Sequence, residues 1–267
     1  MVKRLLLSFI SLILILGTFF VYFETKEQQN KVEKKCKELN YQESLALHPK
    51  NFSAFELEIS FPSEKRWRKN IIKSQLNAKK NLALSGEKYY TPSQRVKADI
   101  IVRVSEKLSC KLKARVRPHG LLDDHRDGSD ILPSLNVVLE NGNIFGITKF
   151  ILFRPQTRAW DNEIVISKIL KEINYLSPRT TKTKLIYNNQ ILNFIFQERI
   201  AKEFLEYNSQ KEGPLYEGDN KIFLKYPKNN NEKYDLIKHK LINEKWSLTS
   251  KNHTHISQEG LSILNKS

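Results

Sequence analysis

Hydrophobic residues follow three patterns along this chain: one continuous run, several alternating stretches and a few helical faces. The continuous run, Leu5–Phe23, contains nineteen residues without a charge and follows Lys3 and Arg4. At about 1.5 Å per residue it is just long enough to cross a hydrocarbon core of about 30 Å. The run ends in bulky residues from Thr18 onward, whereas a cleaved signal peptide needs small residues at its cleavage site. It therefore predicts a transmembrane anchor at 5–23.

The charges beside this run indicate a topology. Lys3 and Arg4 favour the cytoplasm for residues 1–4 and export for the rest, although lysines also follow the run. The expected location is the inner (plasma) membrane, single-pass, with most of the chain extracytoplasmic. Residues 24–50 are highly charged and contain no glycine, so we expect a polar stalk there.

Beyond residue 50 the pattern changes to strands and amphipathic helices. In the stretch from Phe55 to Phe61 every second residue is apolar, which is typical of a half-buried strand. The other expected strands are 98–104, 110–117, 134–140, 145–153, 182–187 and 192–197. The expected helices are 64–84, 160–173, 201–208 and 232–245. Turns at 141–143 and 188–190 predict two hairpins, because Asn and Gly tolerate left-handed backbone geometry.

These elements predict an α+β fold, a mostly antiparallel sheet with a few helices, preceded by one transmembrane helix. A chain of 267 residues is long enough for one core of ordinary size. We expect the α+β domain at 51–226 and a polar C-terminal helix and tail at 227–267.

The composition adds a strong positive charge. Lys and Arg number 45 against 29 Asp and Glu, which gives a formal net charge of +16. Such a surplus favours anionic partners, but the basic residues are widely spread, which is also typical of diffuse solvated charge. The only cysteines are Cys36 and Cys110, without a CxxC motif or zinc-type spacing, so no structural metal site is expected. Whether the two cysteines pair is left open.

Three features are candidates for chemistry. Arg115 and Arg117 alternate with Val116, so both should project from one face of a strand, where two guanidinium groups can clamp a phosphate or simply aid solubility. Glu198 ends an apolar strand and is expected to be partly buried, with an ion pair as the simpler role. His253 and His255 alone do not make a metal site.

With the histidine pair set aside, the remaining candidate is the polar loop at 118–130. Its spacing lacks the ligands that a calcium-binding loop needs at the third and twelfth positions. The remaining interpretations are a solvated turn, or a loop over a phosphate in which Gly120 and exposed amides contribute.

Three stretches in the middle of the chain match, in order and spacing, motifs of a known family. The first, Lys113–Gly120 (KARVRPHG), matches a strand and glycine loop of the type R-x-[RK]-G. The second, Ser134–Leu139 (SLNVVL), matches the motif K-x-S-[FY]-R-[IV]-K-[FL]. The third, Lys184–Glu198 with Glu212–Tyr216, matches the motif N-G-x-x-x-G-x-Y-x-L-x-E and its continuation. Over about 111–219 the chain therefore resembles the CotH kinase family, atypical protein kinases first known from spore coats. The resemblance implies a phosphate- or nucleotide-binding role for Arg115, Arg117, Gly120 and Glu198.

The chain departs from the family at positions that matter for catalysis. Leu132 or Pro133 stands where the family has a lysine, and Asn136 and Val138 replace its next basic residues. The downstream acidic motif that the resemblance implies is missing, because Asp235 is the only Asp after Asp219. Phosphoryl transfer relies on a cation at the phosphates and on metal ions held by carboxylates.

The sequence thus predicts a membrane-anchored CotH-like protein of the cell envelope, a non-catalytic or incomplete kinase-like domain that binds phosphate-bearing or anionic ligands. One alternative is an active envelope kinase with metal ligands such as Asp123, Asp124 or Asp219. Another is a basic structural protein that docks an anionic envelope polymer. No catalytic or metal-ligating residue is assigned, and ATP with Mg²⁺ is expected only for the kinase alternative. The expected partners are the membrane and an anionic polysaccharide or envelope protein, and nucleic acid is not expected.

Overall fold

The computed structural model describes residues 55–85, 88–105, 108–126, 132–218 and 239–265. The strands are β1 (Glu56–Ser60), β2 (Val96–Ser105), β3 (Leu108–Pro118), β4 (Leu135–Leu139), β5 (Lys149–Phe153), β6 (Thr180–Tyr187), β7 (Gln190–Glu198), β8 (Tyr216–Gly218) and β9 (His239–Leu241). The helices are α3 (Glu64–Ser85), α4 (Asn162–Glu172), α5 (Lys202–Tyr207), α7 (Glu244–Ser247) and α8 (Lys251–Leu264), with short 3₁₀ turns η1 (Asp123–His125) and η2 (Pro155–Arg158).

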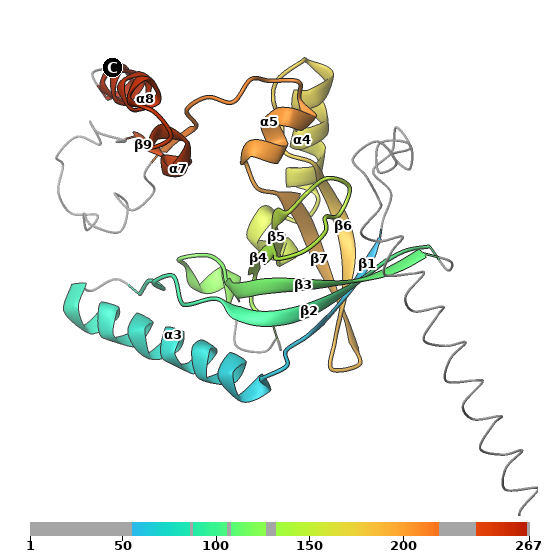
Figure 1. Ribbon diagram of the computed structural model, residues 1–267. Helices are drawn as coiled ribbons and strands as arrows, with labels where there is room; N and C mark the ends of the chain where they lie inside the picture. Colours follow the sequence, from blue (N-terminus) through green and yellow to red (C-terminus); the bar gives the residue numbers. More distant parts are fainter. Residues whose placement is uncertain (1–54, 86–87, 106–107, 127–131, 219–238, 266–267) are drawn as a thin grey trace, which may run out of the picture.

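Seven strands form a closed barrel in the order β1-β2-β3-β4-β5-β7-β6 (Figure 1). All neighbours are antiparallel except β1 and β6, which pair in parallel over three residues, from Glu56 opposite Lys184 to Glu58 opposite Ile186. The hydroxyl of Thr183 on β6 donates a hydrogen bond of 2.7 Å to the carbonyl of Phe55, just before β1. This short seam joins the first strand to the last one in the sheet.

The hydrophobic core occupies the inside of the barrel. Alternate residues of each strand point inward, so that Leu135, Phe150, Leu152 and Phe196 are all fully buried. The rings of Phe150 and Phe196 lie 4.5 Å apart between centres. Period-two alternation in 134–139 and 149–153 predicts that Leu135, Phe150 and Leu152 share one buried sheet face, and the structure confirms this.

Helices cover parts of the outer surface. Trp67 of α3 is 2% exposed and stacks on Phe61 with ring centres 4.2 Å apart. α4 lies against β6, where Ser167 donates a hydrogen bond to Thr180. At the C-terminal side, β8 and β9 pair with each other, and α7 and α8 pack beside them, apart from the barrel in Figure 1.

The predicted fold class is wrong. The strands expected in the sheet of an α+β domain instead close into a barrel, because β1 pairs with a strand more than 120 residues further along the chain. Periodicity predicts which residues face a core, but it carries no information about a pairing between distant strands.

The membrane part of that prediction is corrected as well. Within the described ranges, no helix is long and apolar enough to cross a membrane. The run Leu5–Phe23, from which a single-pass transmembrane protein was predicted, lies outside the described residues, as do the N-terminal residues 1–4 and the stalk at 24–50.

The C-terminal region also differs from expectation. Residues 239–241 form strand β9 and residues 244–247 a short helix, where the sequence predicted one helix at 232–245; residues 232–238 lie outside the described part. The polar end contains the fourteen-residue helix α8, which begins after Ser250, whose side chain accepts a hydrogen bond from the amide of His253. Cys110 is disulfide-bonded, and Cys36, the only other cysteine of the chain, lies outside the described residues.

Candidate functional site

β3 carries the two predicted arginines on the outer face of the barrel. Ala114 and Val116 are fully buried in the core, so Arg115 and Arg117, which alternate with them, project outward as expected. Arg115 is largely exposed, and its Nε lies 2.5 Å from Oε1 of Glu140. Arg117 is half-buried and has no carboxylate partner among the described residues. The two arginines thus differ: Arg115 is neutralised and Arg117 is not.

Two further guanidinium groups lie close to Arg117. Arg95 directly precedes β2, whose first residue pairs with Val116, so it lies beside Arg117. Its Nη2 donates a hydrogen bond of 2.9 Å to Oδ1 of Asn136, the residue opposite Arg117 on β4. Arg199 directly follows β7, and its amide donates to the carbonyl of Lys149 on β5. We call Arg95, Arg117 and Arg199 the arginine cluster.

The electrostatics of the arginine cluster are unfavourable in the free protein. Burial lowers the pKa of Arg117, and the charge of Arg199 lowers it further. Burial also lowers the pKa of Arg95, followed by the charges of Arg117, Arg199 and Arg115. Like charges that are close together in a half-buried place disfavour the charged form of each group. An anion bound between them would reverse that effect.

The loop after β3 folds back over the same outer face. Gly120 has φ of +90°, and a Cβ atom there would lie 2.1 Å from the His125 ring, so glycine is required by backbone and packing alike. Nδ1 of His125 lies 3.1 Å from the hydroxyl of Ser134, which also accepts a hydrogen bond from the amide of Arg154. The ring of His119 packs edge-on against those of His125 and Phe153. Gly120 therefore serves the packing of this loop.

Both histidines of the loop are strongly shifted towards the neutral form. Burial lowers the pKa of His119 to about 3, with further contributions from His125, Arg158, Arg199 and Arg117. Burial likewise lowers the pKa of His125 to about 4, against the opposing effect of Asp124. Since His119 feels the charges of Arg117 and Arg199, the loop and the arginine cluster form one continuous basic region.

Three arginines of this region have buried hydrogen-bond donors without partners among the described residues. Arg126 stacks on Tyr90 and Arg158 on Phe153, each with its guanidinium carbon 3.9 Å from the ring centre. Within the described part of the chain, Nε of Arg95, Nε and Nη1 of Arg126 and Nε of Arg158 are buried without a hydrogen-bond partner. A buried donor without a partner costs about 1–3 kcal/mol, more when it is charged. These groups are suited to an anionic acceptor that supplies the missing bonds.

Glu198, by contrast, is already occupied. It is 2% exposed, and Arg179 donates to it from Nη2 at 2.7 Å and from Nε at 2.8 Å. Arg179 also donates to the carbonyl of Phe145 at 2.6 Å and lies over the ring of Tyr207. Glu198 points into the end of the barrel, because it continues the inward positions Phe194 and Phe196 of β7. The ion pair expected from the sequence is present, and Glu198 does not join the arginine cluster.

The carboxylates proposed as metal ligands are not gathered either. Asp123 accepts a hydrogen bond of 2.7 Å from the Tyr90 hydroxyl and lies 2.9 Å from Nζ of Lys88. Burial raises the pKa of Asp123, but these two hydrogen bonds outweigh it and the net shift is downward. Asp124 accepts from the amide of His125, and Asp219 lies outside the described residues. Among the residues that the structure describes, no three His, Cys, Asp or Glu are grouped as a metal site.

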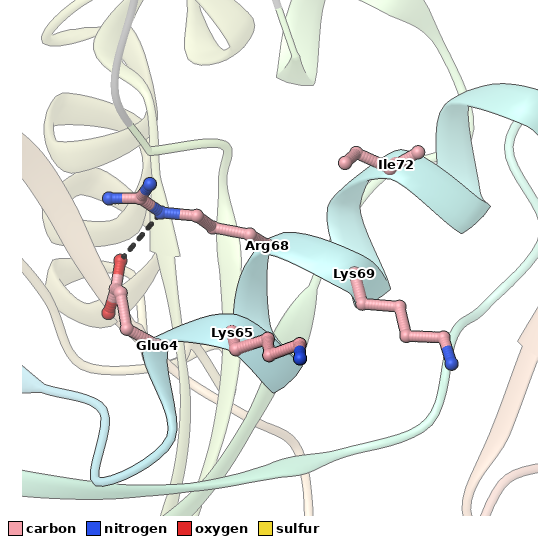
Figure 2. Close-up of a pocket in the computed structure, with 5 residues that line it drawn as sticks. All are labelled: Glu64, Lys65, Arg68, Lys69 and Ile72. Carbon is pink, nitrogen blue, oxygen red and sulfur yellow. Dashed lines mark ion pairs between the residues drawn. The ribbon is translucent and has the colours of Figure 1, made fainter.

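One hollow of about 610 Å³ lies along the first turns of α3. Figure 2 shows the five side chains that line it. Within the described residues, its walls come from this helix alone, at Glu64, Lys65, Arg68, Lys69 and Ile72. Glu64 is paired with Arg68 at 3.6 Å and also accepts a hydrogen bond from the Tyr187 hydroxyl. One exposed helix face without converging groups is a weaker candidate than the arginine cluster.

Sequence reasoning found one member of the cluster, Arg117, and missed Arg95 and Arg199. Both missed residues lie just outside strands, and nothing in their neighbourhood marks them. The available signal was the strand pattern, because Arg95 precedes the first strand of the pair that contains Arg117. The pairing of β5 with β7 brings Arg199 beside Lys149, where its charge acts on Arg117.

Fold and site define a seven-stranded barrel protein with an arginine-rich outer face. No protein-family model matches this chain, and no curated protein matches it. The resemblance to the CotH kinase family therefore stays a prediction.

Proposed function

We propose that this chain is a non-catalytic, CotH-like domain of the cell envelope that binds a phosphate-bearing ligand at the arginine cluster. The observation that carries the proposal is the pair Arg117 and Arg199. They lie close enough for Arg199 to lower the pKa of Arg117, and neither has a carboxylate partner among the described residues. Guanidinium groups match phosphate geometry with two parallel hydrogen bonds and stay charged at any physiological pH.

The partly buried position strengthens this argument. The charge of an exposed arginine is stabilised by hydration, but a half-buried cation beside other cations has lost part of that hydration. Arg95 has a buried Nε without a partner in the described region, and its Nη2 is already oriented by Asn136. A phosphate group has several acceptor oxygens and negative charge, so it satisfies both the missing hydrogen bonds and the repulsion.

The fate of the carboxylates supports binding without catalysis. Glu198 is held by Arg179 in a buried ion pair, and Asp123 is held by Lys88 and Tyr90. The kinase alternative needs carboxylates that are free to hold metal ions at the phosphates. The docking alternative is an anionic polymer on the same basic surface, and a binding measurement with small phosphates distinguishes it from the proposed phosphate site.

The test measures binding of tripolyphosphate and of ATP to the full chain by calorimetry, with and without Mg²⁺. We expect weak binding that Mg²⁺ does not strengthen, at least tenfold weaker in the double variant Arg117→Ala/Arg199→Ala. Lys113→Ala is the matched control, since Lys113 is exposed on the same strand and face but lies outside the cluster. It should change affinity twofold or less.

Arg115→Ala should have a smaller effect than Arg117→Ala, because Glu140 already neutralises Arg115. Mg²⁺-dependent transfer of labelled γ-phosphate, lost in Asp123→Asn, would contradict the proposal and favour the kinase alternative. Absence of binding to both phosphates would favour the docking alternative.

A further inference from the structure

A second hollow lies on a different part of the barrel. It measures about 460 Å³ and is bounded by β6, β7, the start of β1 and the turn between η2 and α4. This volume is within the range of pockets that bind small molecules, about 300–1,000 Å³. Its inner wall is apolar, with Phe55, Phe194 and Ile195 all buried. We call it the Trp160 pocket, after the large side chain at its edge.

Trp160 is unusually placed for a tryptophan. Its side chain is 66% exposed, and it has no ring partner among the described residues. Trp160 has φ of +60° and the preceding Ala159 has φ of +46°, so two successive residues adopt the left-handed conformation without being glycine. The turn is held by the amide of Trp160, which donates 2.9 Å to the carbonyl of Pro155. Such conformations cost about 1–3 kcal/mol each and occur preferentially at binding sites.

The charges around the pocket cancel each other. Lys182 lies 2.7 Å from Asp161, and Lys184 lies 3.4 Å from Glu56. Two cations and two anions therefore give no net charge, in contrast to the arginine cluster and to the strongly basic chain as a whole. A charged ligand would gain little here, because each ammonium or carboxylate group already has its counter-ion.

Uncharged hydrogen-bonding capacity remains available. Asn193 lines the pocket, is exposed, and its carboxamide makes no side-chain hydrogen bond within the described residues. Asp161 and Lys182 are both more than half exposed, so they can accept from and donate to a further group while they stay paired. The pocket thus combines an open aromatic surface, an apolar wall and a polar edge without net charge.

We propose that the Trp160 pocket binds a neutral pyranose unit of a glycan. A pyranose ring has an apolar face of C–H groups, which packs on an indole, and a rim of hydroxyls that donate and accept hydrogen bonds. The indole of Trp160 supplies the surface, while Asp161, Lys182 and Asn193 line the same pocket and can bind the hydroxyls. An anionic sugar is disfavoured by the compensated charges, and a purely apolar ligand would leave the polar edge unmatched. This inference does not depend on the proposed phosphate binding.

The experiment uses three neutral probes, maltohexaose, cellohexaose and chitohexaose, with the full chain. Of the three tryptophans, Trp67 is buried and Trp246 is stacked on His253, so quenching by iodide reports mainly on Trp160. We expect at least one hexasaccharide to protect the fluorescence and to bind in calorimetry. Trp160→Ala should weaken that binding at least tenfold, and Trp160→Phe should restore part of it.

Tyr175→Ala is the matched control, because Tyr175 is an aromatic residue with the same 66% exposure outside the pocket. It should leave glycan binding unchanged, as should Arg117→Ala/Arg199→Ala, which separates this site from the phosphate site. The inference is overturned if none of the three hexasaccharides binds, or if Trp160→Ala binds as well as the unaltered chain. Protection by adenosine without protection by any hexasaccharide would also overturn it, since the pocket would then take an aromatic base.

Discussion

Replacement of Glu198 by Gln should remove a large part of the barrel's stability without affecting the proposed phosphate site. Glu198 and Arg179 have side chains only 1% and 7% exposed, and they share two short charge-assisted hydrogen bonds of 2.7 and 2.8 Å. In Glu198→Gln, Arg179 keeps its charge in a buried place but loses the compensating charge, and the second carboxylate oxygen is replaced by an NH₂ donor that faces the guanidinium. Removal of one partner of such a pair costs about 3–5 kcal/mol. Since domains are stable by about 5–15 kcal/mol, the loss is a large fraction of the total.

The assay is urea unfolding of the full chain, followed by circular dichroism. The double variant Arg179→Met/Glu198→Leu is the matched control, because it removes both charges and should recover most of the lost stability. Phosphate binding measured under native conditions should be unchanged in the double variant. A loss below about 1 kcal/mol in Glu198→Gln, or a loss of phosphate binding at full stability, would refute this assignment and return Glu198 to the ligand site.

Two further predictions concern pH and the core. The pKa of His119 is lowered to about 3 and that of His125 to about 4, so the folded state excludes protons that the unfolded state binds below about pH 6.5. These groups should leave the free energy of unfolding unchanged above pH 6.5 and lower it by about 2 kcal/mol per histidine by pH 5. In urea unfolding, the variant His119→Gln/His125→Gln should lose correspondingly less stability between these pH values. An equal loss in the variant and the unaltered chain would be evidence against burial of the two histidines. Leu152 is fully buried in the barrel, so Leu152→Ala should lower the free energy of unfolding by about 2–5 kcal/mol. A decrease below about 1 kcal/mol in thermal unfolding would contradict its place in the core.

The candidate site was predictable only in part. Alternation around Val116 was enough to place Arg115 and Arg117 on one face, because side chains of a strand alternate regardless of the rest of the fold. It did not distinguish them, since Arg115 meets Glu140 only through the pairing of β3 with β4. For Gly120 the sequence left a solvated turn and a phosphate loop open, and its φ of +90° and the nearby His125 ring add a packing reason for glycine. Glu198 was expected in an ion pair, but its partner Arg179 follows from the pairing of β6 with β7.

The sequence alone determined the local elements and which of their faces point inward. Period-two alternation marks β3 and the burial of Leu135 and Leu152 because it reflects backbone geometry within a few residues. The tertiary structure alone decided the closure of the barrel, through a parallel seam between residues 56–58 and 184–186. It also decided which charged groups surround Arg117, since Arg95 and Arg199 belong to other segments of the sheet. Contacts of this kind depend on register between distant segments, and the free energy that selects one register comes from the whole core rather than from any local pattern.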